Sequence, residues 1–105
     1  MEQRRKGSEM YGTVMRAKAK PGSRQEVVAM MGESLDTKGF RATYVLLPDD
    51  DEDAVVAGVI FEDQKAYSAN AHDPATEAWY GRFRALLEDD PNWTDGDWVS
   101  FLSTR

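Results

Sequence analysis

Few side chains in this 105-residue chain are of the types that commonly carry out chemistry. The sequence contains no cysteine, which excludes a thiolate nucleophile, a zinc–thiolate site and an iron–sulfur cluster. His72 is the single histidine, so a metal site with two histidine ligands cannot form within one chain. His72 would suit a haem ligand or an acid–base group near neutral pH, and the competing interpretation is a surface histidine in an AHDP turn.

Three residues with polar tips occur close together in the second half of the chain: Tyr67, Asn70 and Tyr80. They would suit a pocket for a flat aromatic ligand, in which apolar walls surround a few hydrogen-bonding groups. Trp79 and Phe83 are spaced as neighbours on one face of a helix, so they either wall such a pocket or belong to the core. The alternative for the three polar residues is that both tyrosines only pack and that Asn70 only ends a helix.

The charged residues restrict the classes of partner. An unbroken acidic run, Asp49 to Asp53, lacks the spaced ligands and central glycine of a calcium loop and favours a solvated hairpin tip. The formal net charge is -6. A surface that binds the phosphates of a nucleic acid needs clustered Lys and Arg, so this negative charge argues against a nucleic-acid partner. No apolar run approaches the ~20 residues of a membrane span. We therefore expect a cytoplasmic protein with neither a nucleic-acid partner nor a membrane partner.

Apolar periodicity divides the chain into the elements that would position these residues. Segments with alternating or continuous apolar residues predict strands at 10–18, 40–47, 54–61 and 97–102. Helices are predicted at about 24–37, at 63–70 and from 73 to the stop at Pro91. Ser23 and Glu26 have the spacing of a capping box at the start of the first helix. Residues 1–9 show no periodicity, and we expect them to be a disordered tail.

With the two later helical pieces counted as one helical region, the element order is β-α-β-β-α-β, typical of a ferredoxin-like α+β domain, which we expect over residues 10–105. Its antiparallel four-stranded sheet would carry the helices on one face only. The alternation in 40–47 places Phe40, Ala42, Tyr44 and Leu46 on one face, opposite Thr43, Val45 and Leu47. Because these strands are apolar on both sides, the open face would expose a large apolar patch. A second copy of the chain laid on that face would cover it, which predicts a homodimer.

Two long stretches resemble a known family: YGTVMRAKAKPGSRQEVVAMM and FEDQKAYSANAHDPATEAWYGRFRALLEDDPNWTDGDWVSF. They resemble the antibiotic-biosynthesis-monooxygenase-like proteins of the dimeric α+β barrel superfamily, over roughly Tyr11 to Phe101. The resemblance lies in the K-P-G break before the first helix, the F-E-D start of the helical region, the N-A-H-D-P break and the W-Y helix leading to D-P-N-W-T-D-G. It implies a homodimer whose two sheets form a barrel, with a pocket in each subunit between sheet and helices.

The resemblance also implies a function. Some members oxygenate polycyclic aromatic phenols without metal or flavin, because the electron-rich substrate itself activates dioxygen. Asn70 and Tyr80 match the asparagine and tyrosine of those members and would be catalytic, whereas the place of their tryptophan falls near Pro74. The residues expected to bind substrate are Tyr44, Tyr67, His72, Trp79 and Phe83.

The predicted function is thus a cofactor-independent monooxygenase, without a metal, acting on an aromatic or quinol-type small molecule. The alternatives are a non-catalytic dimeric small-ligand-binding protein and, through His72, a haem-binding protein.

Overall fold

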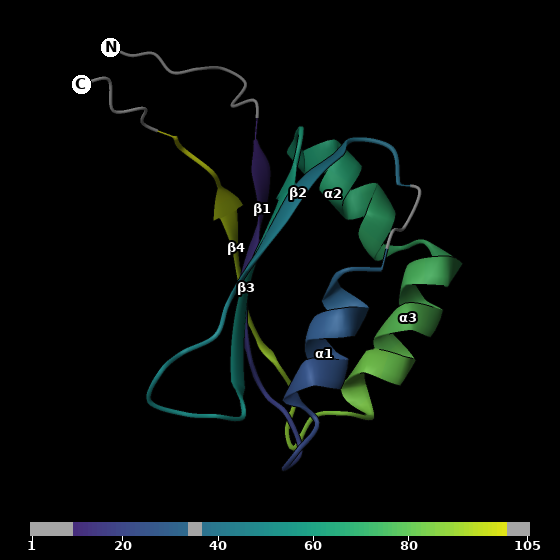
Figure 1. Ribbon diagram of the computed structural model, residues 1–105. Helices are drawn as coiled ribbons and strands as arrows, with labels where there is room; N and C mark the ends of the chain where they lie inside the picture. Colours follow the sequence, from purple (N-terminus) through teal and green to yellow (C-terminus); the bar gives the residue numbers. More distant parts are fainter. Residues whose placement is uncertain (1–9, 34–36, 101–105) are drawn as a thin grey trace, which may run out of the picture.

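The computed structural model describes residues 10–33 and 37–100, which form one sheet with three helices on one side of it (Figure 1). The elements in chain order are β1 (Tyr11–Lys18), α1 (Arg24–Met31), β2 (Phe40–Leu46), β3 (Ala54–Phe61), α2 (Gln64–Ala71), α3 (Pro74–Arg84) and β4 (Asn92–Asp97). The sheet is antiparallel throughout, in the order β2-β3-β1-β4. The predicted ferredoxin-like α+β fold is confirmed. The predicted tail at residues 1–9 lies outside the described residues.

A β-bulge in β2 corrects the predicted division of that strand into two faces. The pairing shifts register between Phe40 and Ala42, after which Thr43 pairs with Val59 and Val45 with Ala57. A bulge adds one residue to a strand, so residues on either side of it no longer alternate in phase. Phe40 therefore shares the helix-covered face with Thr43 and Val45, and not the face of Ala42, Tyr44 and Leu46 as the simple alternation predicted.

The helix ends also differ from the prediction in part. The first helix, α1, ends at Met31 and not at Thr37, and the Ser23 side chain makes no capping hydrogen bond. The other two starts behave as predicted, because Asp63 accepts a hydrogen bond from the backbone N–H of Ala66 and Asp73 accepts one from Ala75. These two aspartates fix where α2 and α3 begin.

The last strand was predicted five residues too late. Residues 92–97 form β4, whose Asp95 and Gly96 pair with Thr13 and Gly12 of β1. The Asp-Gly pair, which is common in turns, here lies inside an edge strand. Charged residues are tolerated on such a strand because one side of its backbone faces solvent. Residues 101 and 102 of the predicted strand lie outside the described residues.

The core fills only part of the space between the helices and the sheet. Its buried members come from β1, α1, β3, α3 and the segments that follow β1 and α3: Met15, Ala17, Ala19, Val27, Met30, Val55, Ala57, Phe83 and Leu87. Trp79 stacks on Phe83 with ring centroids 4.7 Å apart. In Figure 1, α1 and α3 lie beside the lower half of the sheet and α2 beside its upper half.

Trp98 lies on the opposite, open face of the sheet. Its indole N–H donates a hydrogen bond to the carbonyl oxygen of Val59 at 3.0 Å. A Cβ atom on Gly58 would lie 3.1 Å from the Trp98 ring, and one on Gly12 would overlap the Val59 carbonyl oxygen. The two strand glycines therefore allow the indole to approach the backbone closely. The sequence predicts that Trp93 and Trp98, on either side of T-D-G-D, pack against a turn there; for Trp98 this contact with the sheet replaces that prediction.

Candidate ligand-binding site

A cavity of about 950 Å³ lies between the sheet and the helices, beside the core. Its position follows from β1, since Met15 and Ala17 are buried in the core while Thr13, farther toward the start of the strand, lines the cavity. Six aromatic side chains line it: Phe40, Phe61, Tyr67, Trp79, Tyr80 and Trp93. A cavity of this size with mainly apolar walls is typical of small-molecule sites.

Asn70 is held by two hydroxyl groups. The hydroxyl of Thr76 donates to Asn70 Oδ1 at 2.9 Å and that of Thr37 donates to the same oxygen at 3.3 Å. All three residues line the cavity. Because Oδ1 accepts both hydrogen bonds, the orientation of the amide is fixed and its Nδ2 keeps its two N–H donors for another group. The described part of the chain provides no hydrogen-bond partner for Nδ2.

Tyr67 and Asp95 form the second polar pair of the cavity. The Tyr67 hydroxyl donates to Asp95 Oδ1 at 2.9 Å, joining α2 to β4. Burial, followed by the hydrogen bond and the charge of Asp95, raises the pKa of Tyr67 to about 12. Tyr67 is therefore a neutral donor at physiological pH. Its ring packs edge-to-face against Tyr11 and Phe61, which fixes its position.

The structure brings four of the predicted site residues together, since Tyr67, Asn70, Trp79 and Tyr80 all line the cavity. Tyr80 lies beside Trp93, with ring centroids 6.4 Å apart. The catalytic and binding roles of these residues stay predictions.

Three other predicted site residues do not line the cavity. Tyr44 is 68% exposed on the open face of the sheet. Phe83 is fully buried in the core. His72 is exposed at the end of α2, where its Nδ1 lies 2.8 Å from the carbonyl oxygen of Ser68.

Sequence reasoning missed several residues of the site. The sequence predicts a turn at Asp95-Gly96, with Trp93 packed against it, although the alternation of Trp93, Thr94 and Asp95 is the signal of a strand with one face toward the helices. Thr37 and Thr76 had no signal of their own, because only the fold shows that both reach Asn70.

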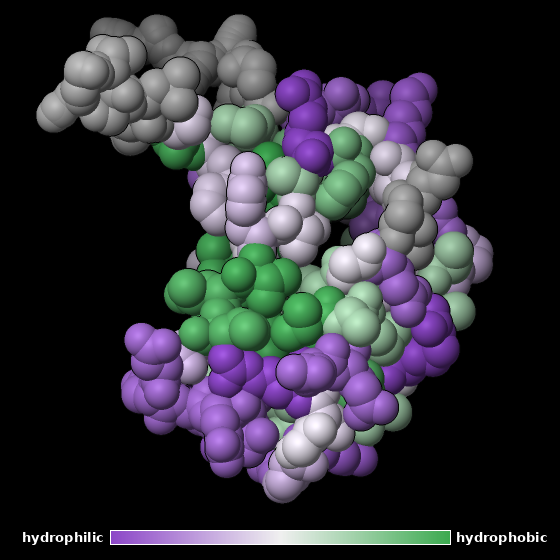
Figure 2. Space-filling view, in the orientation of Figure 1, coloured by the Kyte–Doolittle hydropathy of each residue, from purple (hydrophilic) through white to green (hydrophobic). Residues whose placement is uncertain are grey.

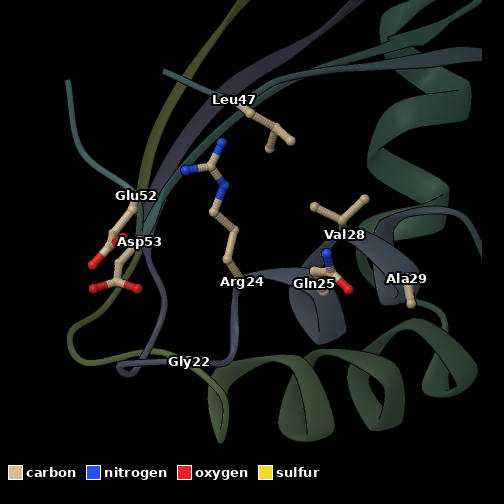
Figure 3. Close-up of a pocket in the computed structure, with 8 residues that line it drawn as sticks. All are labelled: Gly22, Arg24, Gln25, Val28, Ala29, Leu47, Glu52 and Asp53. Atoms are coloured by element: carbon tan, nitrogen blue, oxygen red, sulfur yellow. The ribbon is translucent and has the colours of Figure 1, made fainter. Parts of the chain in front are cut away.

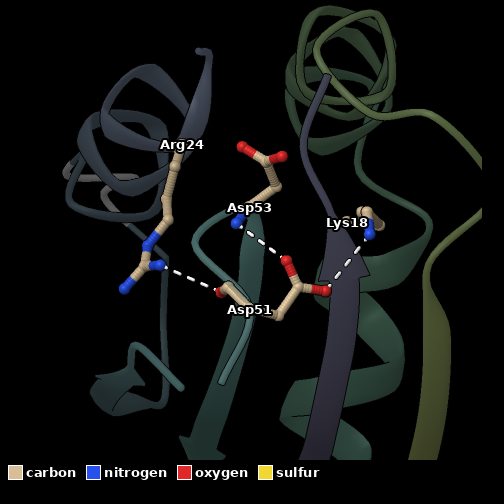
Figure 4. Close-up of polar contacts among 4 residues, drawn as sticks. All are labelled: Lys18, Arg24, Asp51 and Asp53. Carbon is tan, nitrogen blue, oxygen red and sulfur yellow. Dashed lines mark hydrogen bonds and ion pairs between the residues drawn. The ribbon is translucent and has the colours of Figure 1, made fainter. Parts of the chain in front are cut away.

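A second cavity, of about 810 Å³, lies where the β2–β3 hairpin meets the start of α1 (Figure 3). Arg24, Leu47, Glu52 and Asp53 are among the residues that line it. It is close to a hydrogen-bonded tip, shown in Figure 4, in which Asp51 accepts from the Asp53 backbone N–H at 2.9 Å and from Lys18 Nζ at 3.2 Å. The Arg24 guanidinium donates to the Asp51 backbone carbonyl at 3.1 Å.

The hairpin tip is thus a structural network. The backbone N–H of Asp53 and the ammonium group of Lys18 lower the pKa of the Asp51 carboxyl group.

Among the described residues, no group of three or more acidic or histidine side chains is arranged to hold a metal ion. Within the same residues, no helix is long and apolar enough to cross a membrane.

Comparisons with known proteins give matches to solved structures only. No protein-family model and no curated protein matches the chain. A putative antibiotic biosynthesis monooxygenase from Chloroflexus aurantiacus superposes with a TM-score of 0.71 at 22% identity, covering 90% of this chain and 97% of that one. A monooxygenase from the gene ActVA-Orf6 of Streptomyces coelicolor, solved with the ligand nanaomycin D, gives a TM-score of 0.77 at 17% identity, covering 90% and 92%.

The third structure is a mutant of SnoaB, a cofactor-independent oxygenase from Streptomyces nogalater. It gives a TM-score of 0.72 at 17% identity, with 91% of this chain and 99% of that chain covered. Identities this low establish the fold and not the activity. The predicted resemblance is therefore confirmed for the fold: the chain has the α+β fold of the structures named antibiotic biosynthesis monooxygenases.

Proposed function

We propose that the protein is a cofactor-independent monooxygenase that acts on an aromatic or quinol-type small molecule. The observation that carries this proposal is the cavity of about 950 Å³, with its six aromatic side chains and the oriented amide of Asn70. Support comes from the fold, which is shared with a structure named a cofactor-independent oxygenase and with a monooxygenase solved with nanaomycin D.

The residues of the cavity suggest how such a reaction would be assisted. The aromatic walls would hold a flat substrate and exclude water, while Asn70 Nδ2 would donate a hydrogen bond to a ring carbonyl oxygen. This bond strengthens as negative charge develops on that oxygen when the substrate loses a proton. Tyr80, beside Trp93, would place a second polar group along the ring edge.

The substrate itself supplies the electrons. In the oxidation of an anthrone by dioxygen, one oxygen atom replaces the two hydrogens of the ring methylene and becomes a carbonyl. The other oxygen atom leaves with those two hydrogens as water. Atoms and electrons balance with dioxygen as the only oxidant.

The test measures dioxygen uptake with dithranol, an anthrone, against a blank without protein. We expect Asn70→Ala to lower kcat/KM by about a hundredfold, because it removes a donor to the developing oxyanion. Asn92→Ala is the matched control, since Asn92 is an exposed asparagine at the start of β4 that does not line the cavity. Equal uptake by both variants, with the fold retained by circular dichroism, would refute the proposal.

We also propose that two copies associate through the open face of the sheet. Three apolar side chains of that face are exposed, with exposed fractions of 40% for Val14, 68% for Tyr44 and 64% for Leu46. Figure 2 shows strongly hydrophobic residues gathered over the sheet side, above the hydrophilic hairpin tip. Such a patch is usually covered by a partner, and a second copy is the commonest one.

Light scattering after size-exclusion chromatography tests this assembly. The wild-type protein is expected to elute as a dimer and Leu46→Glu as a monomer, because a charge would be buried between the sheets. Gln64→Glu, which adds the same charge on exposed α2, is expected to remain a dimer. A monomeric wild-type protein over a range of concentrations would contradict the proposal.

A further inference from the structure

The charged residues that line the cavity all have the same sign. They are Glu33, Glu77 and Asp95, and within residues 10–33 and 37–100 no Lys, Arg or His lines it. Glu33 is neutralised by Arg82, whose guanidinium lies 3.2 Å away. Glu77 and Asp95 have no cation within ion-pair distance in the described part of the chain.

The hydrogen bonds around Asp95 leave mainly acceptors facing a ligand. The Tyr67 hydroxyl uses its proton on Asp95 Oδ1, and the Thr13 hydroxyl uses its proton on the carbonyl oxygen of Thr94 at 3.1 Å. What remains is mainly the second carboxylate oxygen of Asp95, because the hydroxyl groups of Thr13 and Tyr67 also contact each other. This end of the cavity can therefore accept hydrogen bonds from a ligand.

The Asn70 end has the opposite polarity. Its Oδ1 is occupied by the hydroxyls of Thr37 and Thr76, so Nδ2 can only donate. Asn70 lies about one turn beyond Tyr67 on α2. The two ends together match a neutral molecule that carries a carbonyl group and a hydroxyl group on one rigid ring system.

We propose that Asp95 makes the cavity selective for neutral aromatic ligands, accepting a ligand hydroxyl while Asn70 donates to a ligand carbonyl, and rejecting ligands that place an anionic group there. This inference rests on the proposed function for the aromatic class of the ligand. A carboxylate brought to Asp95, which is exposed to solvent, would meet a like charge and a hydrogen-bond acceptor where it needs a donor. Both effects weaken binding.

Three dihydroxyanthraquinones test the selectivity, because they differ only in one ring substituent. Chrysophanol carries a methyl group, aloe-emodin a hydroxymethyl group and rhein a carboxylate that is ionised at neutral pH. Dissociation constants are measured by quenching of tryptophan fluorescence. We expect wild-type protein to bind the two neutral ligands and to bind rhein at least about tenfold more weakly.

Asp95→Asn keeps the shape of the side chain and removes its charge. It is expected to tighten rhein binding and to weaken chrysophanol binding, because a neutral amide oxygen accepts the ligand hydroxyl less strongly than a carboxylate does. The ratio of the two dissociation constants should therefore shrink at least about tenfold. Asp97→Asn is the matched control, because Asp97 lies two residues along the same face of β4, changes the net charge equally and does not line the cavity. It is expected to change neither ligand.

The possible results separate this inference from the proposed function. If wild-type protein binds rhein as tightly as chrysophanol, the selectivity is refuted and the aromatic site stands. If Asp95→Asn and Asp97→Asn improve rhein binding equally, the effect belongs to the overall charge, and the role of Asp95 is refuted. If none of the three compounds binds, the aromatic-ligand function itself is refuted, and the selectivity with it. The wild-type comparison requires no variant to fold.

Discussion

The two faces of the sheet are built from alternate residues of the same strands, yet their environments differ. On β3, Val55 and Ala57 are fully buried under the helices, whereas Val56 and Ile60 on the open face are only half-buried. On β2, Thr43 lines the cavity while its neighbour Tyr44 is mostly exposed. An apolar pattern on both faces therefore indicates that both need covering, but only the helices decide which face holds the core and the cavity.

The open face has its own specific contact, as the helix side has in the hydrogen bond from the Trp79 indole to the Met30 carbonyl oxygen at 3.1 Å. Trp98 lies across Gly12 and Gly58 and donates to the Val59 carbonyl. Beside it, Tyr44 and Leu46 remain exposed. The helix-covered face is stabilised by the packing of the core. The open face is stabilised by the Trp98 indole and, as proposed above, by association with a second copy of the chain.

The largest expected difference between the two faces comes from removing one large side chain from each. Phe83→Ala should destabilise the protein by about 3–5 kcal/mol, because Phe83 is fully buried and stacked on Trp79. Leu46→Ala, at a mostly exposed position, should cost less than about 0.5 kcal/mol in the monomer. Urea unfolding at low protein concentration measures both. Similar losses for the two variants would contradict the division into a core face and an open face.

A smaller effect is expected at the glycines under Trp98. Gly12→Ala should destabilise by about 1–3 kcal/mol, since the added methyl group would overlap the Val59 carbonyl oxygen and displace the indole. Gly81→Ala in α3 is the control, because nothing lies within 4 Å of the added atom. In a helix interior that change should stabilise by about 0.5–1 kcal/mol. Thermal unfolding of the two variants should shift in opposite directions, and a neutral Gly12→Ala would refute the close contact.

Tyr67 provides a pH-dependent test of the cavity face. Its pKa is raised from 10.0 to about 12, so the folded protein keeps the proton where the unfolded chain has lost it. This contribution to stability is complete below pH 10 and is lost as the pH rises toward about 12. In a titration of tyrosinate absorbance, Tyr67→Phe should remove a step near pH 12.

Asp95→Asn should move the same step to lower pH but not back to 10.0, because burial is the largest cause of the shift. Asp97→Asn should leave it unchanged. A late step that survives in Tyr67→Phe would show that another tyrosine is responsible.

The smallest effect is expected at the hairpin tip, which belongs to neither face. Lys18 and the Asp53 backbone N–H lower the pKa of Asp51, so its contribution to stability is present above its unfolded pKa and is lost as the pH falls through the folded value. Lys18 is exposed and Asp51 is partly exposed, so solvent screens the pair. Asp51→Asn should therefore shift the melting temperature only slightly, and only above the acidic range. A large loss would mean that the tip supports the sheet.

Local patterns were sufficient to predict most of the fold. Apolar spacing predicts the strands β1 and β3 and the side of the sheet that the helices cover. Residues able to satisfy helix ends predict the caps at Asp63 and Asp73. The bulge at Phe40 carries no comparable signal, because it depends on how β2 pairs with β3. The strand at 92–97 was missed because Asp95-Gly96 has the composition of a turn, and pairing with β1 outweighs that preference.

The site was predicted less completely than the fold. Asn70, Tyr67, Trp79 and Tyr80 occur within a short part of the chain, on the consecutive helices α2 and α3, so their proximity could be predicted from the order of the elements. Thr13, Thr37 and Asp95 come from distant segments, and only the folded chain brings them to the same cavity. The partners that orient a side chain are set by tertiary structure, which a motif does not contain.

The central claim is that ligand binds on the helix-covered face, in the cavity beside the core. Two adjacent residues of β2 test it directly, because Thr43 lines the cavity and Tyr44 faces away from it. Thr43→Trp would place a bulky indole inside the cavity, while Tyr44→Trp keeps an aromatic side chain on the open face. Both proteins are compared by thermal unfolding with and without chrysophanol.

A ligand at a hundred times its dissociation constant should raise the free energy of unfolding by about 2.7 kcal/mol, a melting shift on the order of ten degrees for a domain of this size. We predict this shift in the wild-type protein and in Tyr44→Trp, and its loss in Thr43→Trp. A full shift in Thr43→Trp, or its loss only in Tyr44→Trp, would show that the ligand binds elsewhere and would contradict the central claim.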